Sequence, residues 1–327
     1  MDPNHPPASW TRRRLLGSMM IAGSAAGVVL GGDPVRGEEP SDEVAEREGV
    51  EKQARDANLG PLKLYRTERF QVLGTVSETY LRTAGGDCEA VARDFIAHFR
   101  SKGFAVDLPA RRLTVVALAD EADYGKFLGE SRVSLASGGR YDLKTNRLVV
   151  YDYRPAREQV GFRVSWLNLT TLAHEVTHLL CYNSGILDRV GDAPRSIVEG
   201  LATYTEERPP NARRWIGRVN DNRLEDLAHL QRRTPWMTVE SLLVSDDALF
   251  GKAGGLAMLL GYAQSWLLVY YFLSHPERVG AFRAYLASIL TRRDAKNRRL
   301  DAETHFGRLD ELDRALKRFS IDLLKSR

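Results

Sequence analysis

The pentapeptide HEVTH at residues 174–178 combines residue types whose spacing suits metal-dependent chemistry. Residues four apart on an α-helix are neighbours, so His174 and His178 can each offer a ring nitrogen to one ion. Glu175 lies one residue along and can face a water molecule beside that ion. Apolar residues at helical spacing flank the pentapeptide, and Asn183-Ser184-Gly185 indicates where the helix ends. The pattern predicts a zinc hydrolase site on a helix.

The third ligand of such a site must come from elsewhere, because a catalytic zinc ion usually takes three protein ligands and leaves one position open. Glu199 fits that role, since it lies in a second helical segment, PRSIVEGLATY at residues 194–204, which begins at a proline. Twenty residues separate it from His178. That interval lets the first helix end, a loop turn, and the second helix return alongside the first.

The residues that follow Glu199 bear on this assignment. Gly200 and Ala202 are small, so the second helix can pack closely against its neighbours. Glu206 and Glu207 come soon afterwards, and either could take the place of Glu199 if the helix were rotated. Glu199 is the predicted ligand, with these two glutamates as alternatives.

HEVTH followed by EGLATY resembles the gluzincin, or peptidase MA-like, zinc metallopeptidases, and within them a group of exported and mostly uncharacterised proteins. The resemblance covers roughly residues 60–325. It implies that His174, His178 and Glu199 bind one Zn²⁺ ion and that Glu175 is the general base. It implies no cofactor other than zinc.

The resemblance also implies a tyrosine that stabilises the negatively charged oxygen of the transition state. GYAQSW at residues 261–266 resembles the segment that supplies it, which makes Tyr262 a second catalytic candidate. The alternative is a core aromatic, because other tyrosines follow on the same apolar helix or lie near the ligands. These are Tyr182, Tyr204, Tyr270 and Tyr271.

The sequence departs from thermolysin-like gluzincins after Glu199. Those enzymes have an aspartate four residues further on that supports a histidine ligand, whereas this chain has Thr203. A second hypothesis follows, namely a zinc-containing binding or scaffold protein of the cell envelope without peptidase activity. A zinc hydrolase of a non-peptide bond is a third, since it requires only a different pocket shape.

The first 37 residues have the layout of a twin-arginine export signal. Thr11-Arg12-Arg13-Arg14 precedes an apolar run, rich in glycine and alanine, that ends at Leu30. This run of about 16 residues is shorter than the ~20 that span a bilayer, which favours cleavage over anchoring. We expect an exported protein, periplasmic or extracellular, whose only membrane contact would be this signal segment if it stayed uncleaved.

The composition, with 43% hydrophobic and 28% charged residues in a chain of 327, is that of a globular protein. Without residues 1–37 the chain has 43 basic and 41 acidic residues, a formal charge of +2. Basic residues are matched locally by acidic ones and form no run interleaved with aromatics, which argues against nucleic acid as a partner. The expected partner is a peptide or protein substrate.

Cys88 and Cys181 are the only cysteines, and an oxidising compartment would allow them to pair. Cys181 lies on the apolar stretch just after HEVTH, so a buried free thiol is the alternative. As a fourth zinc ligand Cys181 would close the site, but it lies three residues beyond His178 and does not continue the spacing of four. The histidines without a partner at metal-ligand spacing are assigned no role; they are His98, His229, His275 and His305.

The order of the predicted elements indicates an α+β protein with two sub-domains after the signal. Residues 38–60 are rich in glutamate and indicate a solvated linker or a frayed helix. Residues 61–155 are predicted to form a small mixed or antiparallel sheet with a helix at 88–101; its strands are expected at 70–74, 113–118 and 147–152.

The remaining residues, 156–327, are predicted to form a mainly helical, zincin-like metallopeptidase sub-domain that carries HEVTH and EGLATY, with the active-site cleft between the two sub-domains. Turn residues predict a hairpin at 137–146, just before the last strand. By resemblance to gluzincins, that last strand is expected to be the sheet edge that holds extended substrate over the cleft.

Overall fold

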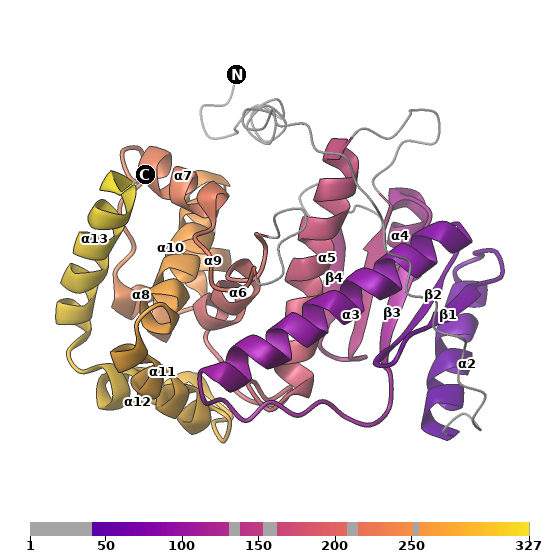
Figure 1. The fold of residues 1–327 in the computed structure, drawn as a ribbon, viewed down its shortest axis with the longest axis horizontal. Coiled ribbons are helices and arrows are strands. Elements are labelled where there is room, and N and C mark those ends of the chain that lie inside the picture. The colour runs from indigo at the N-terminus through magenta and orange to yellow at the C-terminus, as the bar shows by residue number, and fades with distance from the viewer. Residues whose placement is uncertain (1–40, 131–137, 153–161, 208–214, 251–254, 327) are drawn as a thin grey trace.

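The computed structural model describes residues 41–130, 138–152, 162–207, 215–250 and 255–326 (Figure 1). The predicted export signal at residues 1–37 lies outside the described residues.

Five strands form one mixed sheet in the order β1-β2-β3-β5-β4. Its centre is parallel and consists of β2 (Phe70–Gly74), β3 (Leu113–Leu118) and β5 (Arg147–Tyr151). The edge strands, β1 (Lys63–Arg66) and β4 (Gly139–Asp142), pair antiparallel with their neighbours. The chain is therefore an α+β protein with a small mixed sheet, and the three predicted strands are confirmed.

The predicted position of the sheet edge is wrong. β5 lies between β3 and β4, and β4, inside the predicted hairpin, forms the edge. The physical reason is burial, because four of the five residues of β5 are buried, as in a strand with neighbours on both sides. β4 is shorter and leaves Arg140 exposed, which is typical of an edge strand.

Helices cover both faces of the sheet. α3 (Glu78–Ser101) and α5 (Phe162–Asn183) pack on one face, and α2 (Ser41–Asp56) and α4 (Glu121–Leu128) pack on the other. Successive side chains of β3 are buried on opposite faces of the sheet, as expected when helices cover both faces. Val115 and Ala117 belong to the core on the side of α3 and α5, whereas Val116 and Leu118 belong to the cluster with α2 and α4.

Helix α2 occupies most of the predicted linker. Val50 is fully buried against the sheet. Glu43 accepts hydrogen bonds from the backbone and side chain of Arg112, and Glu46 pairs through both oxygens with Arg147. The linker interpretation is wrong because composition does not show which glutamates have partners elsewhere in the chain.

After β5 the described chain is helical, as predicted. The HEVTH helix, α5, lies between the sheet and the remaining helices (Figure 1). These are α6 (Arg195–Thr203), α7 (Asp221–Leu230), α8 (Val239–Val244), α9 (Asp247–Phe250), α10 (Gly255–Leu273), α11 (Pro276–Ile289), the short η1 (Ala295–Asn297), α12 (Arg298–Phe306) and α13 (Leu309–Lys325).

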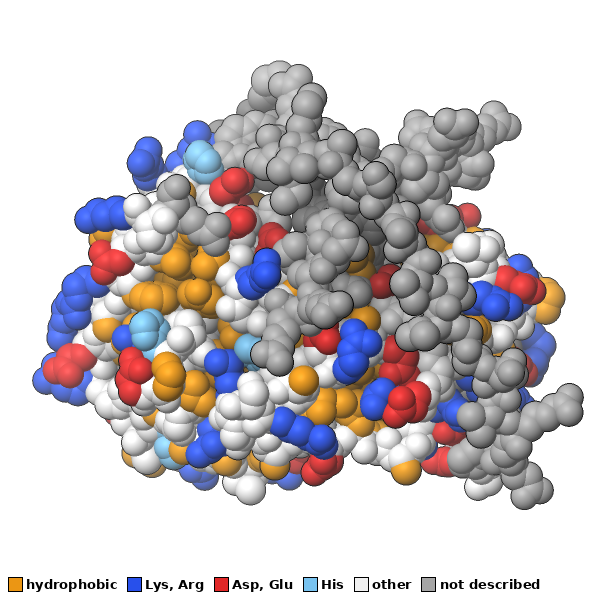
Figure 2. Space-filling view, viewed as in Figure 1, with side chains coloured by type: hydrophobic (Ala, Val, Ile, Leu, Met, Phe, Trp, Pro, Cys, Tyr) orange, Lys and Arg blue, Asp and Glu red, His pale blue; other side chains and the backbone are white. Residues whose placement is uncertain are grey.

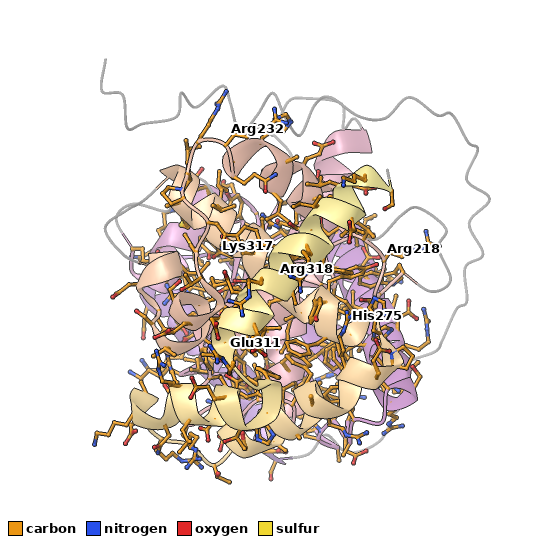
Figure 3. The ribbon with its side chains drawn as sticks, turned by 90° about the vertical axis from the view of Figure 1, so that its left-hand side faces the viewer. Arg218, Arg232, His275, Glu311, Lys317 and Arg318 are labelled. Carbon is orange, nitrogen blue, oxygen red and sulfur yellow. The ribbon has the colours of Figure 1, made fainter. Side chains whose placement is uncertain are left out.

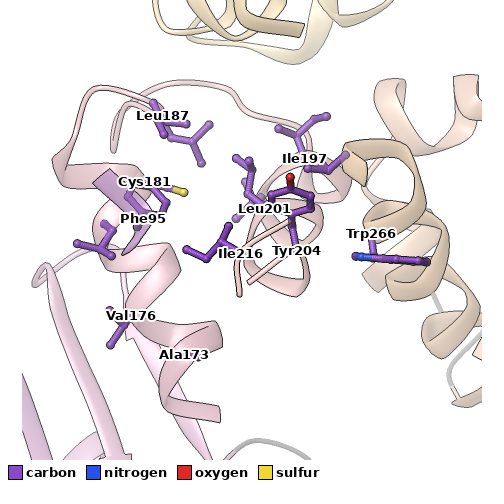
Figure 4. Close-up of a cluster of buried hydrophobic side chains, with 14 of the residues drawn as sticks. Phe95, Ala173, Val176, Cys181, Leu187, Ile197, Leu201, Tyr204, Ile216 and Trp266 are labelled. Atoms are coloured by element: carbon purple, nitrogen blue, oxygen red, sulfur yellow. The ribbon is translucent and has the colours of Figure 1, made fainter. Parts of the chain in front are cut away.

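One hydrophobic core runs through the sheet and the helical part. Figure 4 shows side chains from α5, α6 and α10 within this core, among them Val176, Leu201 and Trp266. Phe95 of α3 and Leu113 of β3 belong to the same cluster. The helix that carries the metal motif is therefore packed from both sides.

Helix α10 is long and apolar enough, by length and composition alone, to cross a membrane, and 61% of its most apolar stretch is buried inside the protein. This burial is expected of a core helix. Its contact with α6 depends on Gly200, because a Cβ there would lie 2.5 Å from the backbone oxygen of Ser265. The predicted close packing of the second helix is confirmed at this glycine.

Charged side chains of both signs are interspersed on the surface. On the face in Figure 2, basic and acidic side chains lie next to one another over the helical part. Figure 3 shows Lys317 and Arg318 on α13 with Glu311 nearby, and Lys317 pairs with Asp313. This pattern agrees with the balanced charge of the sequence.

Candidate metal centre

Three side chains from two helices converge on one point. Nε2 of His174 and Nε2 of His178, on successive turns of α5, lie 3.1 Å apart. Oε2 of Glu199, on α6, lies 3.3 Å from the first nitrogen and 3.5 Å from the second. His178 and Glu199 are buried, and the side chain of His174 is 14% exposed. The structure therefore brings the three predicted ligands together.

The triangle of ligand atoms fits a tetrahedral ion. With bonds of 2.0–2.2 Å and tetrahedral angles, ligand atoms on one zinc ion lie about 3.3–3.6 Å apart. The observed separations are 3.1, 3.3 and 3.5 Å. Among the described residues, no other group of three or more His, Cys, Asp or Glu side chains comes together in this way.

The charges around these atoms also favour a cation. Glu175, Glu199 and Glu206 place three carboxylates at this point, and Arg223 pairs with one of them, Glu206. Burial alone would lower the pKa of His174, but hydrogen bonds to Glu199 and Glu206 outweigh burial and raise that pKa to about 10. Burial would likewise raise the pKa of Glu199, and the two histidines instead hold it well below its usual range. A divalent ion would balance the same excess of negative charge.

Glu175 lies beside the three ligands and is held by the edge strand. Its Oε2 accepts a hydrogen bond of 2.7 Å from the backbone N–H of Tyr141 on β4. Gly139 packs against the same side chain, because a Cβ there would lie 3.0 Å from Cγ of Glu175 and 2.9 Å from Val150. β4 thus fixes the carboxylate of the predicted general base in the wall of the site.

A carboxylate outside the ligand set orients His174. Nδ1 of His174 lies 2.8 Å from Oε1 of Glu206, so this nitrogen donates its proton to the carboxylate, and Nε2 is the nitrogen that faces the other ligands and could bind a metal ion. Arg223 of α7 donates to Glu206 from Nε at 3.0 Å and from Nη2 at 2.8 Å. Asn220 donates to the same carboxylate at 3.0 Å. Burial would raise the pKa of Glu206, and Arg223 and His174 keep it below its usual range.

The carboxylate that supports a histidine ligand in thermolysin-like enzymes has a counterpart in this structure, although the sequence did not identify it. Thr203, at the position of the thermolysin-type aspartate, donates its hydroxyl proton to the backbone oxygen of Glu199 at 2.7 Å. Glu206 provides the carboxylate instead, three residues later, after α6 has ended. It is therefore not the alternative third ligand, and Glu207 accepts from Asn222 instead.

Sequence reasoning missed Asn220 and Arg223. It also did not predict that Glu206 contacts His174. The only signal was the acidic pair at 206–207 directly after EGLATY, which suggested competing ligands. Asn220 and Arg223 belong to no motif, because Asn220 also caps α7 and Arg223 is one of many arginines in the chain.

A cavity of about 290 Å³ opens over the ligands, lined by residues from β4, α5, α6 and α10. Tyr262 of α10 lies in its wall. Burial and the charge of Glu199 raise the pKa of Tyr262, so its hydroxyl keeps the proton and can donate it in a hydrogen bond. The guanidinium of Arg223 lies 5.6 Å from the centroid of the Tyr262 ring. The structure thus brings Tyr262 into one cavity with Glu175 and the ligands.

The other tyrosines near the motifs have different environments. Tyr182 also lines the cavity. Tyr204 is buried, with its hydroxyl 3.1 Å from Nε2 of His98. Tyr270 and Tyr271 pack against an aromatic side chain of α13. Tyr182 is therefore the one alternative to Tyr262 among these four.

Cys88 and Cys181 are both buried free thiols, so the disulfide alternative is wrong and the free-thiol alternative is confirmed. Burial raises the pKa of each thiol, which opposes formation of a thiolate. Cys181 does not belong to the cluster of ligand atoms formed by the described residues.

A family model described as "Protein of unknown function (DUF1570)" matches residues 168–294. The matched segment contains the three ligand residues, Glu175, Glu206 and Tyr262, whereas β4 lies outside it. No curated protein matches the sequence. Over residues 168–294 the chain is thus similar to a family of unknown function, and that segment contains every helical residue assigned above to the metal centre.

Proposed function

We propose that this protein is a zinc-dependent metallopeptidase of gluzincin type, which hydrolyses peptide bonds with metal-activated water. The observation that carries the proposal is the convergence of His174, His178 and Glu199 at an open cavity, with the carboxylate of Glu175 beside them. Zinc bound by these residues supplies Lewis acidity for the carbonyl and for the attacking water. The predicted signal at residues 1–37 would place this activity in the periplasm or outside the cell.

Glu175 is the residue that moves the proton. A carboxylate has two oxygens, so one can stay hydrogen-bonded to Tyr141 on β4 while the other accepts the proton of the attacking water. The same carboxylate then returns the proton to the leaving amine. Tyr262 donates a hydrogen bond to the carbonyl oxygen as negative charge develops there, so its contribution is largest in the transition state.

The edge strand provides a place for the substrate backbone. The carbonyl of Gly138 accepts from Tyr151 on β5, so in the alternating antiparallel pattern the backbone groups of Gly139 and Tyr141 face away from β5. Gly139, Arg140 and Tyr141 line the cavity. Because the N–H of Tyr141 is donated to Glu175, the outward-facing group of this residue that can accept a hydrogen bond from an extended peptide is its carbonyl, and such a peptide would lie along β4 beside the metal centre.

The support of His174 by Glu206 favours an enzyme over the alternative of an inactive binding or scaffold protein. That alternative was motivated by Thr203, where thermolysin-like enzymes have an aspartate. Because Glu206 contacts Nδ1 of His174 in place of this aspartate, Thr203 no longer argues for an inactive protein. A zinc hydrolase of a non-peptide bond would use the same residues and is distinguished by its substrate.

Hydrolysis of a peptide library by the zinc-loaded protein tests the proposal. We expect cleavage by the wild-type protein and a loss of at least about 1,000-fold in kcat for Glu175→Gln, with one zinc ion per chain retained. Glu207→Gln is the matched control, because this glutamate lies near the centre without contacting a ligand, and its activity should stay within about twofold of wild type.

Two results would count against the proposal in different ways. Cleavage that survives Glu175→Gln would show that another group is the base. A zinc-loaded wild-type protein that cleaves no peptide in the library would exclude the peptidase and leave a binding role or a non-peptide substrate.

A further inference from the structure

We propose that Asn146 and Asn183 are positioning residues for Glu175. Their paired side-chain amides join the β4–β5 hairpin to α5 and so keep the backbone N–H of Tyr141 hydrogen-bonded to the carboxylate of the base. The inference rests on the proposed function, in which Glu175 moves the proton. Neither asparagine belongs to the metal cluster or lines its cavity, as the described residues form them, so both would act through Tyr141.

Tyr141 connects the edge strand to the HEVTH helix through three contacts. Its backbone N–H donates to Oε2 of Glu175 at 2.7 Å. Its ring stacks on the ring of Tyr182, with centroids 5.5 Å apart and 16° between the planes. Its hydroxyl donates to Oδ1 of Asn146 at 2.7 Å. Because Asn146 in turn bonds to the last residue of α5, the strand is attached to this helix over about two turns.

The side-chain amides of Asn146 and Asn183 bond to each other in both directions. Nδ2 of Asn146 donates to Oδ1 of Asn183 at 2.9 Å, and Nδ2 of Asn183 donates to Oδ1 of Asn146 at 2.8 Å. Nδ2 of Asn183 also donates to the backbone oxygen of Leu179 at 2.7 Å, so its own helix fixes its orientation. Each side chain must be donor and acceptor at once, which an amide provides and a carboxylate does not.

Local structure accounts for each asparagine singly but not for the pair. Asn146 has a φ of 59°, a left-handed conformation that asparagine tolerates better than most residues. Asn183 ends α5, where a side-chain amide can bond to a backbone oxygen of the preceding turn. Neither reason requires the reciprocal bonds, which join segments 37 residues apart. The pair is therefore a link between the hairpin and the helix.

Other contacts hold the hairpin when this link is broken. Arg189, in the loop after α5, donates to the backbone oxygens of Leu143 and Lys144 at the tip of the hairpin. The ladder with β5 holds the opposite side of β4. Loss of the amide pair should therefore displace Tyr141 relative to α5 without detaching the strand. A displacement of about 1 Å at a group that positions the chemistry can lower the rate about 100-fold.

Hydrogen exchange at the backbone amide of Tyr141, followed by NMR in the metal-free protein, tests the proposal without turnover. Asn183→Asp keeps the size of the side chain but replaces its donor group with an oxygen that repels Oδ1 of Asn146. We expect the Tyr141 amide to exchange at least about tenfold faster in this variant. The amide of Arg140, which faces β5 in the alternating pattern, should exchange within about twofold of its wild-type rate.

Two further variants complete the test. Tyr141→Phe removes only the phenol hydroxyl, and the amide of residue 141 should again exchange at least about threefold faster. This variant decides the question if Asn183→Asp fails to fold. Asn58→Asp is the matched control, because Asn58 is an exposed asparagine in the same left-handed conformation, at φ 54°, between α2 and β1. Its Tyr141 amide should exchange as in the wild-type protein.

The zinc-loaded protein separates a positioning role from a structural one. Asn183→Asp should lower kcat for peptides about 10- to 100-fold. Its Kd for zinc should stay within about threefold of wild type, because the ligands lie on α5 and α6 and the amide pair does not contact them. Asn58→Asp should leave both quantities unchanged.

Unchanged exchange at residue 141 in both Asn183→Asp and Tyr141→Phe would overturn the proposal. Equal acceleration at Arg140 and Tyr141 would also overturn it, because it would show a general loosening of the hairpin. Faster exchange with a wild-type kcat would show that Glu175 does not depend on the link. If the wild-type protein cleaves no peptide, the proposed function fails, whereas the exchange rates still decide whether the amide pair holds Tyr141.

Discussion

Glu206→Gln is expected to weaken zinc binding by about tenfold, because it removes the charge of the carboxylate that orients His174. In the wild-type structure Nδ1 of His174 lies 2.8 Å from the carboxylate oxygen of Glu206. The substitution preserves the size of the side chain, so the amide oxygen of the glutamine can still accept a hydrogen bond from Nδ1. What is lost is the charge assistance. A hydrogen bond to a charged group contributes about 1.5–3 kcal/mol against about 1 kcal/mol for a neutral bond, and about 1.4 kcal/mol corresponds to a factor of ten.

The same variant also removes the partner of a buried arginine. Arg223 makes two hydrogen bonds to Glu206, and its side chain is only 19% exposed. Breaking a buried pair of this kind costs about 3–5 kcal/mol, which Asp226, at 3.6 Å from the guanidinium, would reduce. The double variant Glu206→Gln, Arg223→Gln removes both charges and should recover part of the stability while zinc binding stays weak.

Competition with a chromophoric chelator gives the zinc affinity, and thermal denaturation of the metal-free protein gives the stability separately. Glu207→Gln serves as the control, since this neighbour bonds to Asn222 and should keep wild-type zinc affinity within about twofold. The reasoning is refuted if Glu206→Gln loses stability but binds zinc as tightly as wild type. Glu206 would then be only the ion-pair partner of Arg223.

Three further changes have expected outcomes outside the ligand set. Tyr262→Phe should lower kcat for peptides about 100-fold with zinc content unchanged; an unchanged kcat would make this residue a core aromatic. Gly200→Ala should destabilise the protein by about 1–3 kcal/mol in urea denaturation, because the new Cβ would lie 2.5 Å from the backbone oxygen of Ser265; wild-type stability would mean that α6 and α10 have room to separate. Burial and the charge of Lys102 lower the pKa of His98 to about 4. The unfolded chain, with a histidine pKa near 6.5, therefore binds the proton more readily, so stability should be full above about pH 6.5 and fall by up to about 3 kcal/mol as pH drops to about 4. His98→Gln should remove that part of the pH dependence, and an unchanged profile would assign the acid loss to other groups.

The ligands could be predicted from sequence because the rules that place them are local. His174 and His178 are one turn apart on a single helix, and Glu199 lies on the next helix, where small residues allow close packing. The outer carboxylate could not be predicted in this way. Glu206 meets His174 across 32 residues and Arg223 comes from a third helix, so no periodicity links them.

The two errors in the fold have a similar origin. β4 has only four residues, and its turn-forming composition concealed an edge strand whose partner, β5, follows it closely. The charge of α2 suggested a solvated segment, whereas Glu46 meets Arg147 about a hundred residues later in the chain. Both depend on pairing in three dimensions, which composition and periodicity do not encode.

The central claim is that His174, His178 and Glu199 bind one zinc ion. The most direct test is the zinc content per chain, measured by elemental mass spectrometry after equilibration in zinc-buffered solution, for the wild-type protein and for His178→Ala. We predict about one equivalent in the wild-type protein and almost none in the variant. No zinc in the wild-type protein, or a full equivalent in His178→Ala, would contradict the claim.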